Sequence, residues 1–210
     1  MQIKEKDLDI IAAMHISPTI HSTNLRTPHS QFRFFRDKVQ LFYDFDPNSI
    51  ILTKNDQNQI TGILIYTYDE KKFNQFAGPR HLTFYVRILK TLLGFYGLQF
   101  RKFYNAAKSM LGKNVDNNSN TPILTKKFGK IWVLLVMEEF RRKGIADKLL
   151  QQCIDAMKKH GEKFLQVTVK TDNIPAIKVY EKKGFKTVGT CMESSGESYI
   201  MEISISPEKE

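Results

Sequence analysis

The sequence has few of the features that mark several large classes of protein. Only two of its 210 residues are cysteines, Cys153 and Cys191, which is too few for a disulfide framework. Its five histidines are scattered without metal-ligand spacing or cysteine partners, so we expect no metal site. No apolar run is long enough to span a membrane, and the charged start MQIKEKDLDI lacks the apolar core of a signal peptide. We therefore expect a soluble protein of the cytoplasm.

Acidic residues are missing from one long segment. From Lys71 to Lys113 there are nine lysines and arginines and no aspartate or glutamate. The net charge of the whole chain is +10, so the rest of the chain is close to neutral. The positive charge therefore belongs to one segment, and its explanation should be local too.

Apolar periodicity predicts an α/β protein with a mixed sheet. In the first third we expect an edge strand in MQIKE, helices over residues 6–16 and 30–43, and paired strands over 49–54 and 59–68. The later run KIWVLLV predicts a buried central strand over 130–136. It is followed by a helix from about Gly144, a strand over 163–170, a helix over 173–183 and an antiparallel pair over 185–192 and 198–205.

Two motifs in this later part carry the chemistry. The first is EEFRRKGIADKLL, which places Arg141, Arg142, Lys143 and Gly144 directly before an amphipathic helix. The start of a helix has unpaired N–H groups and the positive end of the helix dipole, so this loop predicts a phosphate site. The second motif, one strand further on, is Asn173-x-x-Ala176-x-x-x-Tyr180-x-x-x-Gly184-Phe185.

In this order, the two motifs resemble the GNAT superfamily of acyl-CoA-dependent N-acyltransferases. The resemblance covers about residues 130–205, and the elements of the first seventy residues fit the family's order. It implies the GNAT fold, an α/β fold with a central mixed, mostly antiparallel, splayed sheet flanked by helices. Residues 71–121, a basic aromatic helical segment and a polar loop, are then an insertion before the cofactor-binding strand. We expect a single domain over residues 1–210.

The resemblance also implies an acetyl-CoA-dependent N-acetyltransferase that acts on a primary amine. The implied cofactor-binding residues are Leu134, Leu135, Val136, Arg141, Arg142, Lys143, Gly144, Ile145, Ala146, Asp147 and Asn173. Tyr180 has the position of the general acid, and a phenol of pKa about 10 can donate a hydrogen bond or a proton to the leaving thiolate.

The catalytic base is not evident from the sequence. In the branch of the family that acetylates protein N-termini, a glutamate commonly lies five residues before the asparagine, and here that position is Thr168. This substitution leaves room for a second interpretation, in which the chain is a catalytically silent acyl-CoA-binding module whose insertion binds a partner or a membrane surface.

The basic insertion has several interpretations. Its apolar residues form a helical stripe of Leu82, Tyr85, Val86, Leu89, Leu92, Leu93 and Tyr96, and Gly94 and Gly97 predict a break into two helices. The cations can be merely solvated, they can favour an anionic acceptor, or they can hold residues 80–112 against an anionic membrane. Nucleic-acid binding is not expected, because no recognised nucleic-acid module is visible. The sequence leaves the acceptor, the acyl chain length and the oligomeric state open.

Overall fold

The computed structural model describes residues 3–15, 28–78, 82–95, 128–193 and 196–205. Its backbone divides into two compact units, which we describe one at a time. The first unit contains Met1–Leu41 and Asn74–Asn120, and the second contains Phe42–Phe73 and Thr121–Glu210. The expectation of a single domain over residues 1–210 stays a prediction. No helix among the described residues is long and apolar enough to cross a membrane.

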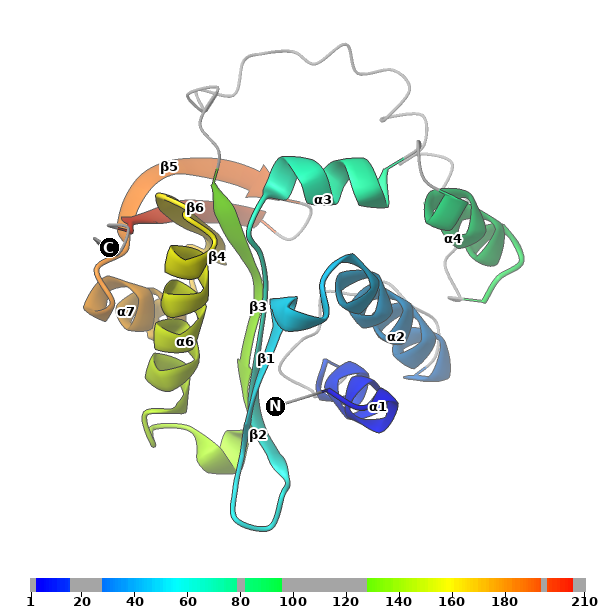
Figure 1. Cartoon of the computed structure of the whole chain (residues 1–210), viewed down its shortest axis with the longest axis horizontal. Coiled ribbons are helices and arrows are strands. Elements are labelled where there is room, and N and C mark those ends of the chain that lie inside the picture. The colour runs from blue at the N-terminus through cyan, green and yellow to red at the C-terminus, as the bar shows by residue number, and fades with distance from the viewer. Residues whose placement is uncertain (1–2, 16–27, 79–81, 96–127, 194–195, 206–210) are drawn as a thin grey trace. The chain divides into compact units, whose positions relative to one another are not determined.

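The second unit is built on a six-stranded sheet with the order β1-β2-β3-β4-β6-β5 (Figure 1). The strands are β1 (Ile50–Lys54), β2 (Ile60–Thr67), β3 (Gly129–Val136), β4 (Phe164–Lys170), β5 (Lys186–Glu193) and β6 (Gly196–Ser204). Only the pair β3 and β4 is parallel, and the other four neighbouring pairs are antiparallel. The mixed, mostly antiparallel sheet expected from the sequence is confirmed.

Two helices of the second unit pack on this sheet. They are α6 (Ile145–Lys159) and α7 (Ile174–Lys182). The described part of the unit also contains two short 3-10 turns, η1 (Pro47–Ser49) and η2 (Glu138–Phe140), the end of α2 (Pro28–Phe45) from Phe42, and the start of α3 (Glu70–Ala77) as far as Phe73. The apolar stripe of α6 forms one buried cluster with residues of β2, β3 and β4, among them Leu149, Met157, Ile131 and Leu165. Because α6 and α7 share this cluster, the helices and strands that carry the two sequence motifs are joined by a common core.

The opposite face of the sheet carries an aromatic group. Phe42 stacks on Phe73 with ring centroids 4.6 Å apart, and Trp132 lies 5.3 Å from Phe73. Side chains alternate along a strand, so Trp132 and its neighbour Lys130 lie on the other side from Ile131. Lys130 is held at this face by an ion pair of 2.7 Å with Glu70.

The helices of the first unit lie in its described residues. They are α1 (Glu5–Met14), α2 (Pro28–Phe45) as far as Leu41, the end of α3 (Glu70–Ala77) and α4 (Leu82–Leu92). His15, directly after α1, stacks on Phe35 of α2 with ring centroids 4.9 Å apart. The helices expected over residues 6–16 and 30–43 are therefore confirmed, with shifts of a few residues at their ends.

The expected edge strand in MQIKE is wrong. The described part of that stretch leads into α1, which begins at Glu5. The backbone N–H of Lys4 donates a hydrogen bond of 3.0 Å to the carboxylate of Asp7, which satisfies a group that the helix start leaves unpaired. In the insertion, α4 ends at Leu92, and Gly94 has a φ of 76°, as expected for a break there. The second helix predicted after Gly97 lies outside the described residues.

Candidate functional site

The sheet opens between its two parallel strands. β3 and β4 pair at only three positions, Gly129 with Leu165, Lys130 with Gln166 and Ile131 with Val167. Both strands then continue, β3 to Val136 and β4 to Lys170, with no further pairing between them.

On its other edge, β3 stays paired with β2 as far as Gly62 opposite Val136. The edge of β3 that faces β4 therefore offers backbone N–H and C=O groups over residues 132–136. An extended molecule can pair with these groups as a further strand would.

A bulge lies where the opening begins. In the β2–β3 ladder Ile65 is opposite Val133, and the next residue, Tyr66, is opposite Ile131. Trp132 is thus the extra residue of a β-bulge, a feature that is common beside active sites because it redirects a strand. The side chain of Trp132 donates a hydrogen bond of 3.0 Å to the hydroxyl of Thr67, which holds the bulge in place. No local pattern in the sequence predicted this bulge.

The turn between β3 and α6 has an unusual backbone. Arg142 has a φ of 60° and Gly144 has a φ of 76°, so both are left-handed. This conformation is easy for glycine and costs energy for arginine. A Cβ added to Gly144 would meet no atom within 4 Å, so the backbone at the start of α6 is open to its surroundings. We predicted from the sequence that a ligand approaches the backbone here, and the open glycine is what such an approach requires.

The first turn of α6 has N–H groups to offer. The helical hydrogen bonds begin with the N–H of Lys148, which donates to the carbonyl of Gly144 over 3.0 Å. The N–H groups that precede Lys148 in the first turn have no acceptor within the helix. Among the described residues no side chain caps the helix either. Gly62, opposite Val136, lets the helix start lie close to β2, because a Cβ there would be 2.8 Å from the side chain of Ile145. The three described features (glycine, open backbone and unpaired N–H groups) make this helix start suitable for an anion.

Cations surround the same turn. The Nε of Arg141 donates to the carbonyl of Val136 over 3.3 Å, which ties the turn to the end of β3. The Nζ of Lys143 lies 5.1 Å from the centre of the Phe140 ring. All three cations of the turn, including Arg142, are exposed. Their positive charges can attract an anionic ligand at the helix start.

One partner of this turn was missed in the sequence. Lys183, just after α7, forms an ion pair of 3.0 Å with Asp147 in the first turn of α6. This pair joins the two sequence motifs, and it balances the negative charge of Asp147 beside the phosphate site that the sequence predicts. Sequence reasoning could not find it, because the two residues are 36 positions apart and only the tertiary fold brings them together.

The second motif lies on α7. Asn173 caps this helix, and its side-chain oxygen accepts a hydrogen bond of 3.3 Å from the N–H of Ala176. Tyr180 is 5% exposed and packs edge to face on Phe185, with ring centroids 5.5 Å apart. Burial, followed by the charge of the nearby Cys153, raises the pKa of Tyr180 above its ordinary value of 10. Its phenol therefore keeps its proton at neutral pH.

The catalytic and cofactor-binding residues that the sequence predicts all lie in the second unit. The open part of β3 contains Leu134, Leu135 and Val136. The turn before α6 and the first turn of this helix contain Arg141, Arg142, Lys143, Gly144, Ile145, Ala146 and Asp147. Asn173 caps α7, and Tyr180 lies on that helix. The same buried cluster contains Tyr180 and has Leu134, Val136 and Ile145 packed against it. No group of three or more metal-ligating side chains gathers in the described parts of the chain.

The structure does not select a catalytic base. Thr168 is half-buried on β4, opposite Ile200 of β6, where the sheet has begun to open. Next to it on the same face, Gln166 donates a hydrogen bond of 2.9 Å to Glu202, so this carboxylate is near the opening as well. Glu138 and Glu139 lie on η2, on the other side of the opening.

Comparison with known proteins agrees with this fold. The family model described as the acetyltransferase (GNAT) family matches residues 21–185, which is more than half of the chain. The chain belongs to this family. The motifs that predicted it, the helix start at Gly144 and the capped helix with Tyr180, both lie within the matched residues.

Relatives by sequence match a shorter part of the chain. An N-alpha-acetyltransferase of Saccharolobus solfataricus is 40% identical over 73 residues, which is 34% of this chain and 43% of the relative. The N-alpha-acetyltransferase 30 of Schizosaccharomyces pombe is 39% identical over 57 residues, or 27% of this chain and 38% of the relative. The chain thus matches less than half the length of these relatives.

Solved structures share the fold over nearly the whole chain. A crystal structure of SsHAT has a TM-score of 0.67 at 13% identity and covers 98% of this chain and 97% of that chain. An acetyltransferase structure has a TM-score of 0.63 at 18% identity and covers 98% of both. Chaetomium thermophilum Naa20, in complex with a bisubstrate analogue, has a TM-score of 0.57 at 16% identity and covers 98% of this chain and 85% of that one. At these identities the likeness concerns the fold.

Proposed function

We propose that this chain is an N-acetyltransferase that moves an acetyl group from acetyl-CoA to a primary amine by direct attack. The observation that carries the proposal is the opening of the sheet. β3 and β4 separate after Ile131 and Val167, and the free edge of β3 leads directly to the uncapped start of α6 at Gly144. A strand edge followed by an anion site fits a cosubstrate that has an extended amide arm and a pyrophosphate.

In this proposal the backbone of Leu134, Leu135 and Val136 pairs with the pantetheine arm. The pyrophosphate lies at the first-turn N–H groups of Ile145 and its neighbours, with the cations of the turn around it. Asn173 contacts the arm from the start of α7. The pantetheine arm needs only the backbone of β3, so apolar side chains are suitable at its three positions.

The chemistry then needs one proton donor at the sulfur. The amine nitrogen forms a bond to the thioester carbonyl carbon, and the carbon–sulfur bond breaks as the intermediate collapses. Tyr180 donates its hydroxyl proton to the departing thiolate and regains one from solvent, while the amine gives up one proton to solvent. Because burial raises the pKa of Tyr180 above that of a thiol, a hydrogen bond to the developing negative charge is the larger part of its contribution.

A pair of tyrosine variants tests this role. Tyr180→Phe removes only the hydroxyl, and we expect turnover to fall by about a hundredfold to ten-thousandfold while acetyl-CoA affinity is retained. Tyr66→Phe is the matched control, because Tyr66 is also buried and its pKa is also raised by burial, yet it lies on β2 with no assigned role. Thiol release measures turnover, and calorimetric titration measures affinity. Equal turnover of Tyr180→Phe and the wild-type protein would refute the general-acid assignment.

The acceptor is chosen by screening. The relatives that match by sequence are named N-alpha-acetyltransferases, which supports testing peptides with a free amino terminus first. Amines with and without negative charge should be compared, because an anionic acceptor is one of the interpretations of the basic segment from Lys71 to Lys113. The location in the cytoplasm is likewise a proposal, which fractionation of cells would test.

Thr168, in the position of the glutamate, favours a second candidate function. In this alternative the chain binds acyl-CoA without transferring the acyl group. The two functions differ in one measurement, since both predict acetyl-CoA binding and only the enzyme releases thiol when a suitable amine is added. Binding without thiol release across the full panel of amines would favour the silent module.

A further inference from the structure

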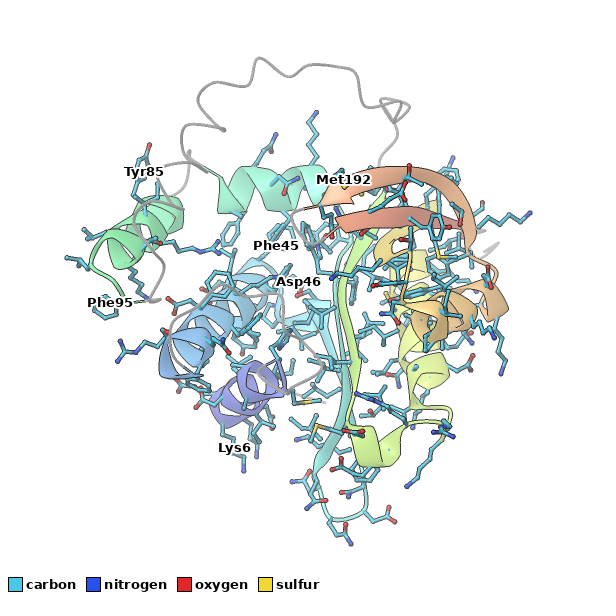
Figure 2. The ribbon with its side chains drawn as sticks, turned by 180° about the vertical axis from the view of Figure 1, so that it is seen from behind. Lys6, Phe45, Asp46, Tyr85, Phe95 and Met192 are labelled. Atoms are coloured by element: carbon cyan, nitrogen blue, oxygen red, sulfur yellow. The ribbon has the colours of Figure 1, made fainter. Side chains whose placement is uncertain are left out.

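A row of polar side chains crosses the sheet just before it opens. Lys130 of β3 pairs with Gln166 of β4, and Gln166 pairs with Glu202 of β6. Residues that pair directly across strands point to the same face, so these three form one line, which we call the polar row. Gln166 is 6% exposed, and its side chain donates a hydrogen bond of 2.9 Å to the carboxylate of Glu202. In Figure 2 the label of Met192 marks β5, and β6 lies beside this strand.

The polar row lies on the face of the sheet away from α6 and α7. Leu165 and Met201, the strand neighbours of Gln166 and Glu202, belong to the buried cluster that these two helices share. Because side chains alternate along a strand, Gln166 and Glu202 point to the other face. Tyr180 belongs to the same cluster as Leu165. Glu202 and Tyr180 therefore lie on opposite faces of the sheet.

Glu202 lies beside the beginning of the opening. The last pair between β3 and β4 is Ile131 with Val167, one residue beyond the polar row. The next residue of β4 on the face of Glu202 is Thr168, which pairs with Ile200. Glu202 and Thr168 are thus diagonal neighbours on adjacent strands, at a separation of roughly 7–8 Å that a long side chain can span. Both are half-buried, so the carboxylate of Glu202 can serve the position at which the sequence lacks the expected glutamate.

We propose that Glu202 accepts the proton of the amine in the proposed acetyl transfer, and that Gln166 holds its carboxylate in place. This inference rests on the proposed function, in which one amine proton reaches solvent and no group is named that carries it. The amine nitrogen gives this proton to the carboxylate, directly or through one water molecule, and forms its bond to the thioester carbonyl carbon. Glu202 then passes the proton to solvent, and the departing sulfur interacts with Tyr180 as described above.

The reaction favours a proton acceptor that is separated from the proton donor. A base beside Tyr180 would compete with the leaving sulfur for the phenol proton, whereas a base on the other face meets the incoming amine. Glu138 and Glu139 lie on η2, between the end of β3 and the proposed phosphate site, and are exposed. The contacts alone do not select a base, but a thioester placed in the opening between β3 and β4 favours Glu202.

A glutamine variant tests the proposal in the full chain. Glu202→Gln keeps the size of the side chain and removes its negative charge. With the amine that gives the fastest thiol release in the screen, we expect turnover at pH 7 to fall by about a hundredfold. Calorimetric titration should show that acetyl-CoA affinity is retained. The matched control is Glu197→Gln, an exposed glutamate five residues earlier on β6, which should keep the turnover of the wild type.

The pH profile separates a proton acceptor from a structural role. A peptide α-amino group has a pKa of about 8, so its unprotonated fraction rises roughly ninefold between pH 7 and pH 9. The deficit of Glu202→Gln should shrink by about this factor over the same range, because an amine that is already neutral needs no base. The charged neighbours on this face are Lys186, opposite Glu202 on β5, Lys170 on β4, and Lys130, which is paired with Glu70. They are present in every variant and therefore affect all profiles alike.

Two further variants address the position of the carboxylate. Gln166→Met removes the hydrogen bond to Glu202 and should lower turnover by a smaller factor than Glu202→Gln does. In the double variant Thr168→Glu/Glu202→Gln a carboxylate returns to the same face from the diagonal position, and turnover should recover in part. A carboxylate at another position would not replace a structural role of Glu202.

The outcomes separate this inference from the proposed function. If the wild-type protein releases thiol and Glu202→Gln matches it, or if the deficit is the same at pH 7 and pH 9, the assignment of Glu202 is wrong and the proposed function stands. If the wild type binds acetyl-CoA but releases no thiol with any amine, the proposed function and this inference are both wrong. Circular dichroism establishes that each variant is folded. Should Glu202→Gln not fold, Gln166→Met decides, and turnover equal to that of the wild type would overturn the proposal.

Discussion

Two glycines at the two ends of α6 allow the proposed phosphate site to be tested apart from stability. Gly144 precedes the helix with a φ of 76°, and Gly161 follows it with a φ of 65°. A Cβ added at either position would meet no atom within 4 Å. Gly144→Ala and Gly161→Ala therefore introduce the same backbone strain and no collision within the protein. Only Gly144 lies at the proposed site.

The cost to stability should be similar for the two variants. A left-handed residue with a Cβ costs roughly 1–2 kcal/mol, and nothing else in either environment adds to this. For a protein of this size, a loss of about 1 kcal/mol lowers the melting temperature by about 2–4 °C. The effect on acetyl-CoA affinity should differ. A methyl group at Gly144 enters the space proposed for the pyrophosphate, and each lost hydrogen bond to a charged group is worth about 1.5–3 kcal/mol, or roughly tenfold to a hundredfold in affinity.

Thermal unfolding and calorimetric titration with acetyl-CoA measure the two effects. We expect both variants to lose stability by similar amounts and only Gly144→Ala to lose affinity. Gly144→Asn separates the effects further, since asparagine tolerates the left-handed conformation and yet fills the space. If Gly144→Ala and Gly144→Asn bind acetyl-CoA as tightly as Gly161→Ala does, the start of α6 is not the pyrophosphate site.

Three further predictions follow from contacts and burial. Lys183→Met should weaken acetyl-CoA binding by a few fold, because it leaves the negative charge of the half-exposed Asp147 without its ion-pair partner. The loss in stability should be less than about 1 kcal/mol. In calorimetric titration, the double variant Lys183→Met/Asp147→Asn should recover the affinity for acetyl-CoA. Burial raises the pKa of Tyr66 above its ordinary value of 10, so the stability that the protonated phenol contributes is complete below pH 10 and is lost above it. Tyr66→Phe removes this ionisation. In denaturant titrations it should reduce the alkaline fall of the unfolding free energy by about 1.4 kcal/mol per pH unit. Burial lowers the pKa of His15 below 6.5, so the stability that the neutral imidazole contributes is complete above pH 6.5 and is lost as the pH falls. His15→Phe should therefore reduce the fall of the unfolding free energy at acid pH. An unchanged fall would contradict the lowered pKa of His15.

Local signals in the sequence were sufficient for most of the elements in the second unit. Asn173 as a cap, Pro175 in the first turn and Gly184 at the end define α7 before any contact is known, and the structure confirms each of them. These residues act through the backbone groups next to them, so their effect does not depend on the rest of the fold. Gly144 is a similar case, because its positive φ is a property of one residue.

The start of the chain illustrates where local signals fail. MQIKE has too few residues for a periodicity to distinguish a strand from the first turn of a helix. The deciding contact is the hydrogen bond between Lys4 and Asp7, which extends α1 to Glu5. The pattern of later residues indicated the helix correctly but not its beginning, since the ends of helices depend on such single contacts.

The sequence by itself determined most of the helices and strands, their order along the chain and the residues that an anion site at the start of α6 requires. Periodicity, caps and glycine conformations are properties of neighbouring residues, and they can be interpreted without the fold. Only the tertiary structure decided where β3 and β4 part, that Trp132 forms a bulge at this point and that Lys183 meets Asp147. These features depend on register and on contacts between distant segments, which no local pattern specifies.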